Sequence, residues 1–255
     1  MRLKDRVVVI TGAAGNIGAA TARRCAREGA RIALLDRDRA GVEAVRDELA
    51  ASAETSHGKH VAMTLDVTDP AQVRDVLGEV ARMCGPIHTL FANAGIEGGS
   101  VPLEDYPDDE FERVMKVNVT SVFYTMKYGE PLMCDGGSIV LTSSVAGFIG
   151  SAVSIGYSAS KHAVIGLMRS GAKHYGRRGI RVNTIHPGFV KSNMLSRILE
   201  ERGGTVTLED MMANLPLKDY LTPDNIADTV AYLASDDSRL VTGQTLVIDS
   251  GFMLR

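Results

Sequence analysis

The stretch "RVVVITGAAGNIG", residues 6–18, decides the fold of this chain. Its first part, residues 6–11, is continuously apolar and β-branched, which is typical of a strand buried on both faces of a sheet. Gly12, Gly15 and Gly18 follow, and a helical pattern begins at residue 16. Glycines in this context let the backbone turn tightly and approach a pyrophosphate, whose charge the first amides of a helix can bind. The stretch therefore predicts a strand, a phosphate-binding loop and a helix in succession.

The same alternation of apolar runs and amphipathic stretches continues to the end of the chain. Strands alternating with helices of a dozen or more residues imply right-handed crossovers and a mostly parallel sheet. We therefore expect one doubly wound α/β domain over residues 1–255. Its further predicted strands are 31–36, 60–67, 88–95, 137–144, 180–188 and 245–251, and its first helices are 16–29, 40–52 and 70–84.

One region interrupts this regularity. Residues 189–222 contain two short helical patterns, 193–201 and 208–215, separated by a loop with Gly203 and Gly204. We interpret the region as a helical insertion over one edge of the sheet, and we expect it to act as a lid on a substrate site.

Composition limits the class of protein. The chain has 255 residues, 23% of them charged, and a formal net charge of -3, so it presents no basic field for nucleic acid or an anionic membrane. The first apolar run is too short for a signal peptide, and no stretch approaches the length of a membrane span. The three cysteines are scattered and the six histidines show no ligand spacing, so we expect a cytoplasmic protein without a metal site.

Asp36 ends the second predicted strand, eighteen residues beyond Gly18. A carboxylate at this place can accept hydrogen bonds from the hydroxyls of an adenosine ribose, and it repels a 2′-phosphate. The acid therefore favours NAD over NADP. Arg37 and Arg39 follow directly, and they leave the use of NADP open.

"YSASK", residues 157–161, places a tyrosine and a lysine one helical turn apart, so both side chains lie on one face. A nearby ammonium favours the phenolate, and Tyr157 could then exchange a proton near neutral pH. Other polar residues stand at the carboxyl ends of later strands, where ligands bind in such sheets. Each alone could be structural, but together they indicate a site: Asn93, Ala94, Gly95, Asn118 and Ser144.

With these motifs, the chain resembles the short-chain dehydrogenases/reductases, from residues 11–18 to the closing "GQTLVIDSG" (243–251). Thirteen residues separate Ser144 from Tyr157, as in the single-domain branch of that family. The resemblance implies an acid/base role for Tyr157 and contact between Ser144 and the substrate oxygen. It also implies that Lys161 binds the nicotinamide ribose and lowers the tyrosine pKa, and that Asn118 positions a water.

The resemblance further implies a set of cofactor-binding residues, some in "LDV" (65–67) and "PGFVKS" (187–192). The full set is Gly12, Gly15, Asn16, Ile17, Gly18, Asp36, Asp66, Val67, Asn93, Ala94, Gly95, Tyr157, Lys161, Pro187, Gly188, Val190 and Ser192.

Two positions depart from the family pattern. Asn16 stands where the family usually has its second glycine, and asparagine tolerates positive φ better than most residues. Ser192 replaces a usual threonine and keeps the hydroxyl. The predicted activity is hydride transfer between a secondary alcohol or its ketone and NAD. The alternative is a non-catalytic NAD(H) sensor of the same fold, and a serine hydrolase built on "GYSAS" (156–160) fits less well because Ser160 replaces the last glycine of that motif.

Two groups of apolar residues bear on the substrate and on the oligomeric state. Apolar residues after Ser144 and in the insertion could line a largely apolar pocket or only pack the insertion: Phe148, Ile149, Met194, Leu195, Ile198, Leu199, Met211, Met212 and Leu215. The helices expected around 107–134 and 157–178 carry apolar residues on more than one face. Family members pair through these helices, so we expect a homotetramer, with a dimer as the second choice.

Overall fold

A computed structural model describes residues 1–55, 59–201, 213 and 215–254. The strands in this part of the chain form a parallel sheet in the order β3-β2-β1-β4-β5-β6-β7. The order reverses between β1 and β4, and ligands bind at such a switch point in α/β sheets. The strands are β1 (Val7–Thr11), β2 (Arg31–Asp36), β3 (Val61–Thr64), β4 (Ile87–Ala92), β5 (Met133–Thr142), β6 (Arg181–Pro187) and β7 (Thr245–Ile248).

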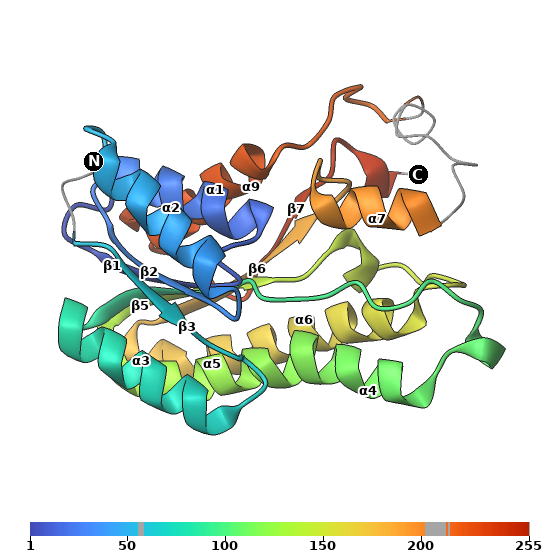
Figure 1. Cartoon of the computed structure of the whole chain (residues 1–255), viewed down its shortest axis with the longest axis horizontal. Helices are drawn as coiled ribbons and strands as arrows, with labels where there is room; N and C mark the ends of the chain where they lie inside the picture. The colour runs from blue at the N-terminus through green and yellow to red at the C-terminus, as the bar shows by residue number, and fades with distance from the viewer. Residues whose placement is uncertain (56–58, 202–212, 214, 255) are drawn as a thin grey trace.

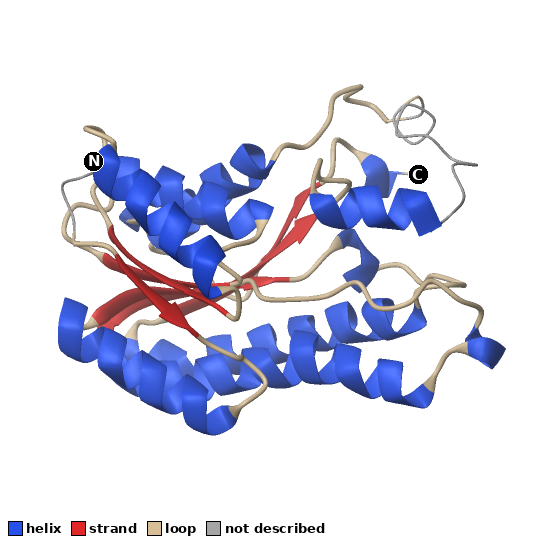
Figure 2. Ribbon diagram, in the orientation of Figure 1, coloured by secondary structure: helices blue, strands red, loops and turns tan. Residues whose placement is uncertain are grey.

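Helices cover both faces of the sheet (Figure 1), and Figure 2 shows the strands as the middle layer. One layer contains α1 (Asn16–Arg27), α2 (Arg39–Ala51) and α9 (Pro223–Ala234). The other contains α3 (Pro70–Cys84), α4 (Asp108–Met115), α5 (Ser121–Gly129) and α6 (Ile155–Tyr175). A separate apolar cluster lies between the sheet and each layer. The predicted doubly wound α/β fold is confirmed.

The helices α2, α3 and α9 begin where the sequence provides side-chain caps. The Asp38 carboxylate accepts from Gly41 N (3.0 Å) at the start of α2, and Asp69 accepts from Ala71 N (2.9 Å) at the start of α3. Thr222 and Asn225 cap α9 reciprocally. Such caps satisfy the first amides of a helix. No side chain caps α1, α4 or α6, and the N-cap residue of α1 is Gly15, which has no side chain.

Several element boundaries differ from prediction, and two of these differences involve predicted site residues. Residues 60–67 were expected to be a strand, but β3 ends at Thr64 because its partner β2 ends at Asp36. The helical region 107–134 is broken by a π-helical turn, Lys116–Thr120, between α4 and α5. A π turn adds a residue to the helix and redirects its side chains, often at functional sites.

The insertion is only partly described. Its first helix, predicted at 193–201, is present as α7 (Asn193–Glu201) and lies beyond the carboxyl ends of β6 and β7 (Figure 1). Gly203, Gly204 and nearly all of the second helical pattern lie outside the described residues, as do Met211 and Met212. The lid therefore stays a prediction. Among the described residues, no helix is both long and apolar enough to cross a membrane.

Candidate active site

A cavity of about 960 Å³ opens at the carboxyl ends of the strands. This volume is at the upper end of the range of ligand pockets, about 300–1,000 Å³. The loops after β1 through β6 line it, and they bring together every predicted site residue except two. Gly18 and Asn118 lie behind the cavity wall, where each supports residues that do line it.

The glycine-rich loop is packed too closely for larger residues. Gly12 has φ +67°, and a Cβ at this position would lie 2.8 Å from the Cα of Ala94. A Cβ on Gly18 would lie 2.2 Å from the carbonyl oxygen of Gly12. Glycine at both positions therefore lets β1, β4 and the start of α1 approach one another. The uncapped amides at the start of α1 face the cavity, an arrangement that binds phosphate.

Asp36 lies at the rim of this loop. Its Oδ2 accepts from Ala14 N and its Oδ1 from Asp38 N, each at 3.1 Å, which fixes the carboxylate beside the cavity. Arg37 also lines the cavity. Arg39 is exposed and forms an ion pair with Glu43 (2.9 Å). The carboxylate of Asp36 is therefore held beside the cavity, whereas the guanidinium of Arg39 is paired with Glu43 instead.

Asn93 joins three strands at the switch point. Its backbone N donates to the hydroxyl of Thr11 (3.1 Å), and its side-chain amide donates to the carbonyl oxygen of Gly12 (3.2 Å). Its Oδ1 accepts from the Thr142 hydroxyl (3.2 Å). The asparagine therefore holds β1, β4 and β5 in register around the floor of the cavity.

Asn118 sits in the π turn, and only 1% of its surface is exposed. Its Oδ1 accepts from Ile96 N (2.8 Å), while its amide donates to Ile96 O (2.9 Å) and to Ser160 Oγ (3.0 Å). Both amide hydrogens are thus occupied. What Asn118 can still offer a water is the second lone pair of its oxygen.

Tyr157 and Ser144 face each other in the cavity. Ser144 starts the short 3₁₀ helix Val145–Gly147, and its hydroxyl oxygen accepts from Ala146 N (3.2 Å). Burial raises the pKa of Tyr157 above that of a free tyrosine, hydrogen bonding to Ser144 lowers it, and the charge of Glu97 raises it further. The net direction is upward. Lys161 is not among these causes, so our expectation that Lys161 lowers the tyrosine pKa stays a prediction.

The contacts of Lys161 bear on this prediction. Its Nζ donates to the carbonyl oxygen of Thr142 (3.0 Å) and lies 5.4 Å from the ring centroid of Tyr157. The two side chains share a helix face as predicted, but the ammonium lies over the ring and is held by a backbone carbonyl. Lys161 is only 3% exposed, and burial lowers its pKa to about 8.

The far end of the cavity carries groups that sequence reasoning missed. Glu97 lines it and forms an ion pair with Arg197 of α7 (2.7 Å). Apolar side chains also line the cavity, including Ile149, Met194 and Leu195, together with polar and charged ones such as Ser154 and Arg113. A single acid in a loop carries no recognisable spacing, and its partner lies 100 positions away.

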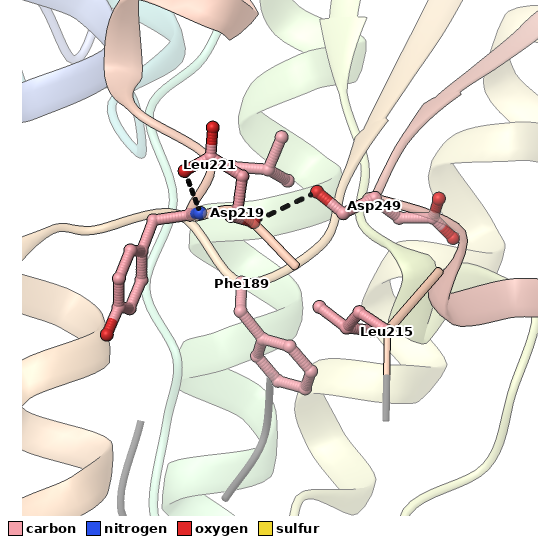
Figure 3. Close-up of a pocket in the computed structure, with 7 residues that line it drawn as sticks. Phe189, Leu215, Asp219, Leu221 and Asp249 are labelled. Atoms are coloured by element: carbon pink, nitrogen blue, oxygen red, sulfur yellow. Dashed lines mark hydrogen bonds between the residues drawn. The ribbon is translucent and has the colours of Figure 1, made fainter. Parts of the chain in front are cut away.

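Leu215 contributes to a different hollow. Figure 3 shows it beside Phe189, with Asp219 and Asp249 nearby. The volume of about 10 Å³ accommodates at most one water molecule, so this hollow is no substrate site. Phe148 packs on His186 at 4.4 Å between ring centroids, while the side chains of Ile198 and Leu199 lie outside the described part of the chain.

Comparison with known proteins identifies this arrangement. A family model described as enoyl-(acyl carrier protein) reductase matches residues 12–253. Levodione reductase of Leifsonia aquatica is 38% identical, over 98% of this chain and 95% of its own length. The chain belongs to the short-chain dehydrogenase/reductase family.

Other family members agree in sequence and in structure. Cyclohexanol dehydrogenase of Acinetobacter sp. (strain SE19) is 33% identical, over 98% of this chain and 96% of its own length. The structure of NAD⁺-bound xylitol dehydrogenase superposes with a TM-score of 0.90, at 34% identity over 98% of this chain and all of that one. A blue fluorescent protein from a metagenomic library, in complex with NADPH, has a TM-score of 0.89 at 34% identity, with 99% of each chain covered.

These relatives are dehydrogenases and reductases or bind a nicotinamide dinucleotide, so the predicted enzyme class is confirmed and the chain is an oxidoreductase. Nothing among them supports the alternative of a non-catalytic sensor. The residues present also fit a dinucleotide, because the close-packed glycine loop, the uncapped amides of α1 and the carboxylate of Asp36 lie along one side of one cavity. The neighbours include both NAD⁺ and NADPH complexes, so a nicotinamide cofactor follows, without a choice between the two.

The structure explains how Asn16 replaces the glycine of the usual family pattern. The tolerance of asparagine for positive φ is not needed here, because Asn16 is the first residue of α1 and its φ is not positive. Its Oδ1 accepts from Asn193 N (3.2 Å), the first residue of α7. The glycine of the usual family pattern is therefore replaced by a side chain that ties the cofactor loop to the insertion.

Proposed function

We propose that this protein is an NAD-preferring dehydrogenase that interconverts a neutral secondary alcohol and its ketone. The main support is the arrangement of one cavity, which has a phosphate-binding loop and Asp36 along one side and Tyr157, Ser144 and Lys161 at the other end. When bound, the cofactor supplies hydride acceptance and donation. The protein supplies position and proton transfer.

Ser144 and Tyr157 would act on the substrate oxygen. The hydroxyl of Ser144 is hydrogen-bonded to Tyr157 and reaches Pro187 O only at 3.5 Å, so a substrate oxygen bound beside both residues would take over the hydrogen bond now made to Tyr157. It would stabilise the charge that develops on the oxygen. In the oxidative direction Tyr157 would remove the hydroxyl proton, and in reduction it would return it.

Lys161 and Asn118 would support this proton transfer. The Lys161 ammonium is buried in the cavity wall near the phenol and is held by Thr142 O, and there it would bind the nicotinamide ribose. The amide of Asn118 holds Ile96 by both backbone groups, so it fixes the loop that follows Gly95. Its remaining oxygen lone pair could hold the relay water.

The preference for NAD should depend on Asp36. With Asp36→Asn, the ratio of kcat/KM for NAD⁺ to that for NADP⁺ should fall by about 10–100-fold, because removing one unfavourable charge contact is worth about 1–3 kcal/mol. Steady-state kinetics with both cofactors measure the ratio, and Asp47→Asn on the exposed face of α2 is the matched control. A wild-type preference for NADP⁺ would contradict the proposal and assign the choice to Arg37.

The substrate we propose is a neutral cyclic secondary alcohol or its ketone. The support is that the cavity lining includes the apolar side chains of Ile149, Met194 and Leu195, and that Glu97 is paired with Arg197. Two relatives with similarity over the whole chain are named for levodione and cyclohexanol. A panel of alcohols with NAD⁺, followed by NADH absorbance and including cyclohexanol and xylitol, tests the class. Activity confined to open-chain polyols or carboxylates would contradict it.

We also propose a cytoplasmic homotetramer, with the dimer as the second choice. Phe111 of α4 and Phe123 of α5 are 38% and 45% exposed, and Leu254 near the end of the chain is 82% exposed. Four chains of 27.3 kDa give about 109 kDa, which light scattering at micromolar concentration should report. Phe123→Glu should shift the distribution to smaller species. A monomeric wild type would refute this assembly.

A further inference from the structure

His186 is a buried titratable group that the proposed mechanism does not use. It lies in β6 directly before Pro187 and Gly188, which line the cavity, and its exposed fraction is 0%. Its Nδ1 is 2.8 Å from the carbonyl oxygen of Ser144, and its Nε2 is 2.8 Å from the hydroxyl of Thr184. Two short contacts on a fully buried imidazole indicate a fixed orientation.

These contacts determine the tautomer. A carbonyl oxygen can only accept, so Nδ1 carries the hydrogen and donates it to Ser144. Nε2 is then the acceptor, and the Thr184 hydroxyl donates to it. Burial lowers the pKa of His186 to about 4, so the ring stays neutral at ordinary pH and keeps this arrangement.

Ser144 depends on few other restraints. Its carbonyl oxygen accepts from Gly147 N (2.9 Å) in addition to the imidazole, so both lone pairs are used. Its hydroxyl is hydrogen-bonded to Tyr157 and lies only 3.5 Å from Pro187 O. The backbone of Ser144 is extended, with φ -166° and ψ 165°, just where β5 gives way to a turn. The carbonyl is therefore the point at which the residue is anchored to the neighbouring strand.

Phe148 covers the outer face of the same imidazole. The two rings are 4.4 Å apart between centroids and inclined by 31°. His186 thus contacts the loop after β5 at both ends, by a hydrogen bond at Ser144 and by ring packing at Phe148. The loop cannot shift relative to β6 without losing one of these contacts.

We propose that His186 is a positioning residue for Ser144: its Nδ1–H fixes the Ser144 carbonyl and thereby aims the hydroxyl at the substrate oxygen and at Tyr157. The inference rests on the proposed function, because Ser144 must act on the substrate. It predicts a change in chemistry without a change in cofactor binding. It also predicts a change in Tyr157 itself, because hydrogen bonding to Ser144 lowers the pKa of that phenol.

Three substitutions separate the hydrogen bond from the volume of the ring. His186→Asn keeps a donor at the place of Nδ1, because both nitrogens are attached to Cγ. His186→Gln moves the donor toward the place of Nε2, and His186→Leu removes it. In the Leu and Gln variants kcat should fall by about 10–100-fold, the cost of a small misplacement of a reacting group, with NADH affinity unchanged. The Asn variant should stay within a few-fold of the wild type.

A spectroscopic titration provides a readout that does not need turnover. The tyrosinate absorbance of the NAD⁺ complex, with Tyr157→Phe as the blank, reports the ionisation of Tyr157. Its midpoint should move to higher pH in His186→Leu and His186→Gln and stay near the wild-type value in His186→Asn. His60→Leu is the matched control, because His60 is also buried and bonded through both nitrogens, to Ile32 N and Thr55 O, away from the cavity.

The outcomes distinguish the alternatives. Equal loss in the Asn and Leu variants, or an unmoved tyrosinate midpoint, would show that His186 only fills space and would overturn the inference. A parallel fall in NADH affinity would show general disruption of the cavity and would also overturn it. If the wild type oxidises no alcohol but the tyrosinate midpoint moves as expected, the positioning role stands and the proposed function fails.

Discussion

Tyr157→Phe should lower turnover by about 10²–10⁴-fold, the range typical for loss of a general acid or base. The substitution removes one hydroxyl and leaves the ring, α6 and Lys161 in place. NADH binding should therefore persist almost unchanged. Steady-state rates on the best alcohol of the panel and a fluorescence titration with NADH give both quantities.

Tyr175→Phe is the matched control for this prediction. It removes the same hydroxyl at the other end of α6, away from the cavity, and should leave kcat unaffected. Retention of full activity in Tyr157→Phe would reject the mechanism, whatever the family membership. Loss of NADH binding in the same variant would instead indicate that the main role of the Tyr157 hydroxyl is to bind the cofactor and not to transfer the proton.

The pH dependence follows from the direction of the tyrosine pKa. Burial raises the pKa of Tyr157 in the free protein, so the phenolate should be absent there at neutral pH. A positive nicotinamide ring beside the phenol favours the phenolate and should bring the ionisation down. Because oxidation requires the phenolate, the rate should rise with pH through this ionisation, and we expect this acidic limb of the kcat/KM profile to lie at lower pH than the pKa of the free protein once NAD⁺ is saturating. An identical tyrosinate titration with and without NAD⁺ would contradict this account.

Lys161→Met should have the second large effect, and it should act in opposite directions on stability and function. The buried ammonium of Lys161 loses hydration, which lowers its pKa from 10.5 to about 8. Below pH 8 the folded state carries this charge at a cost of about 3 kcal/mol, since each pKa unit corresponds to about 1.4 kcal/mol. Methionine removes the cost and also removes one hydrogen bond to Thr142 O, worth about 1–2 kcal/mol.

The expected balance at pH 7 is a gain of about 1–2 kcal/mol, or a few degrees in Tm for a chain of this size. The pH dependence has a definite sign. Between pH 8 and 10.5 the unfolded state binds more protons than the folded state, so wild-type stability should rise with pH across this window. The rise should be missing in Lys161→Met, which makes the variant's advantage disappear at high pH.

Cofactor binding should be weaker in Lys161→Met, although the folded protein is more stable. Loss of charge-assisted hydrogen bonds to the ribose should weaken NADH binding by about 10–100-fold. Thermal unfolding between pH 7 and 10.5 and an NADH titration measure both effects. Lys173→Met, an exposed lysine on the same helix, should change neither. A Lys161→Met variant that is less stable than the wild type at pH 7 would show that the ammonium is compensated by interactions other than the bond to Thr142 O.

The sequence alone determined the features that depend on local pattern. Apolar runs of strand length, the glycines at 12, 15 and 18, and the acid at the end of the second strand require only neighbouring residues to be interpreted. They predicted the parallel sheet, the phosphate loop and the edge at which the site lies. The spacing of Ser144, Tyr157 and Lys161 could be interpreted in the same way, because two of them share one helix and the third ends a strand of the same sheet edge.

The tertiary structure decided whatever depends on contacts between distant segments. The π turn turns Asn118 toward the backbone of Ile96, and the ion pair of Glu97 joins a loop to a helix 100 positions later. The imidazole of His186 meets the carbonyl of Ser144 only because β5 and β6 are adjacent. The direction of the Tyr157 pKa was also undetermined by sequence. Spacing places an ammonium on the same helix face, but only packing decides how much water the phenol loses and to which oxygen the ammonium is bound.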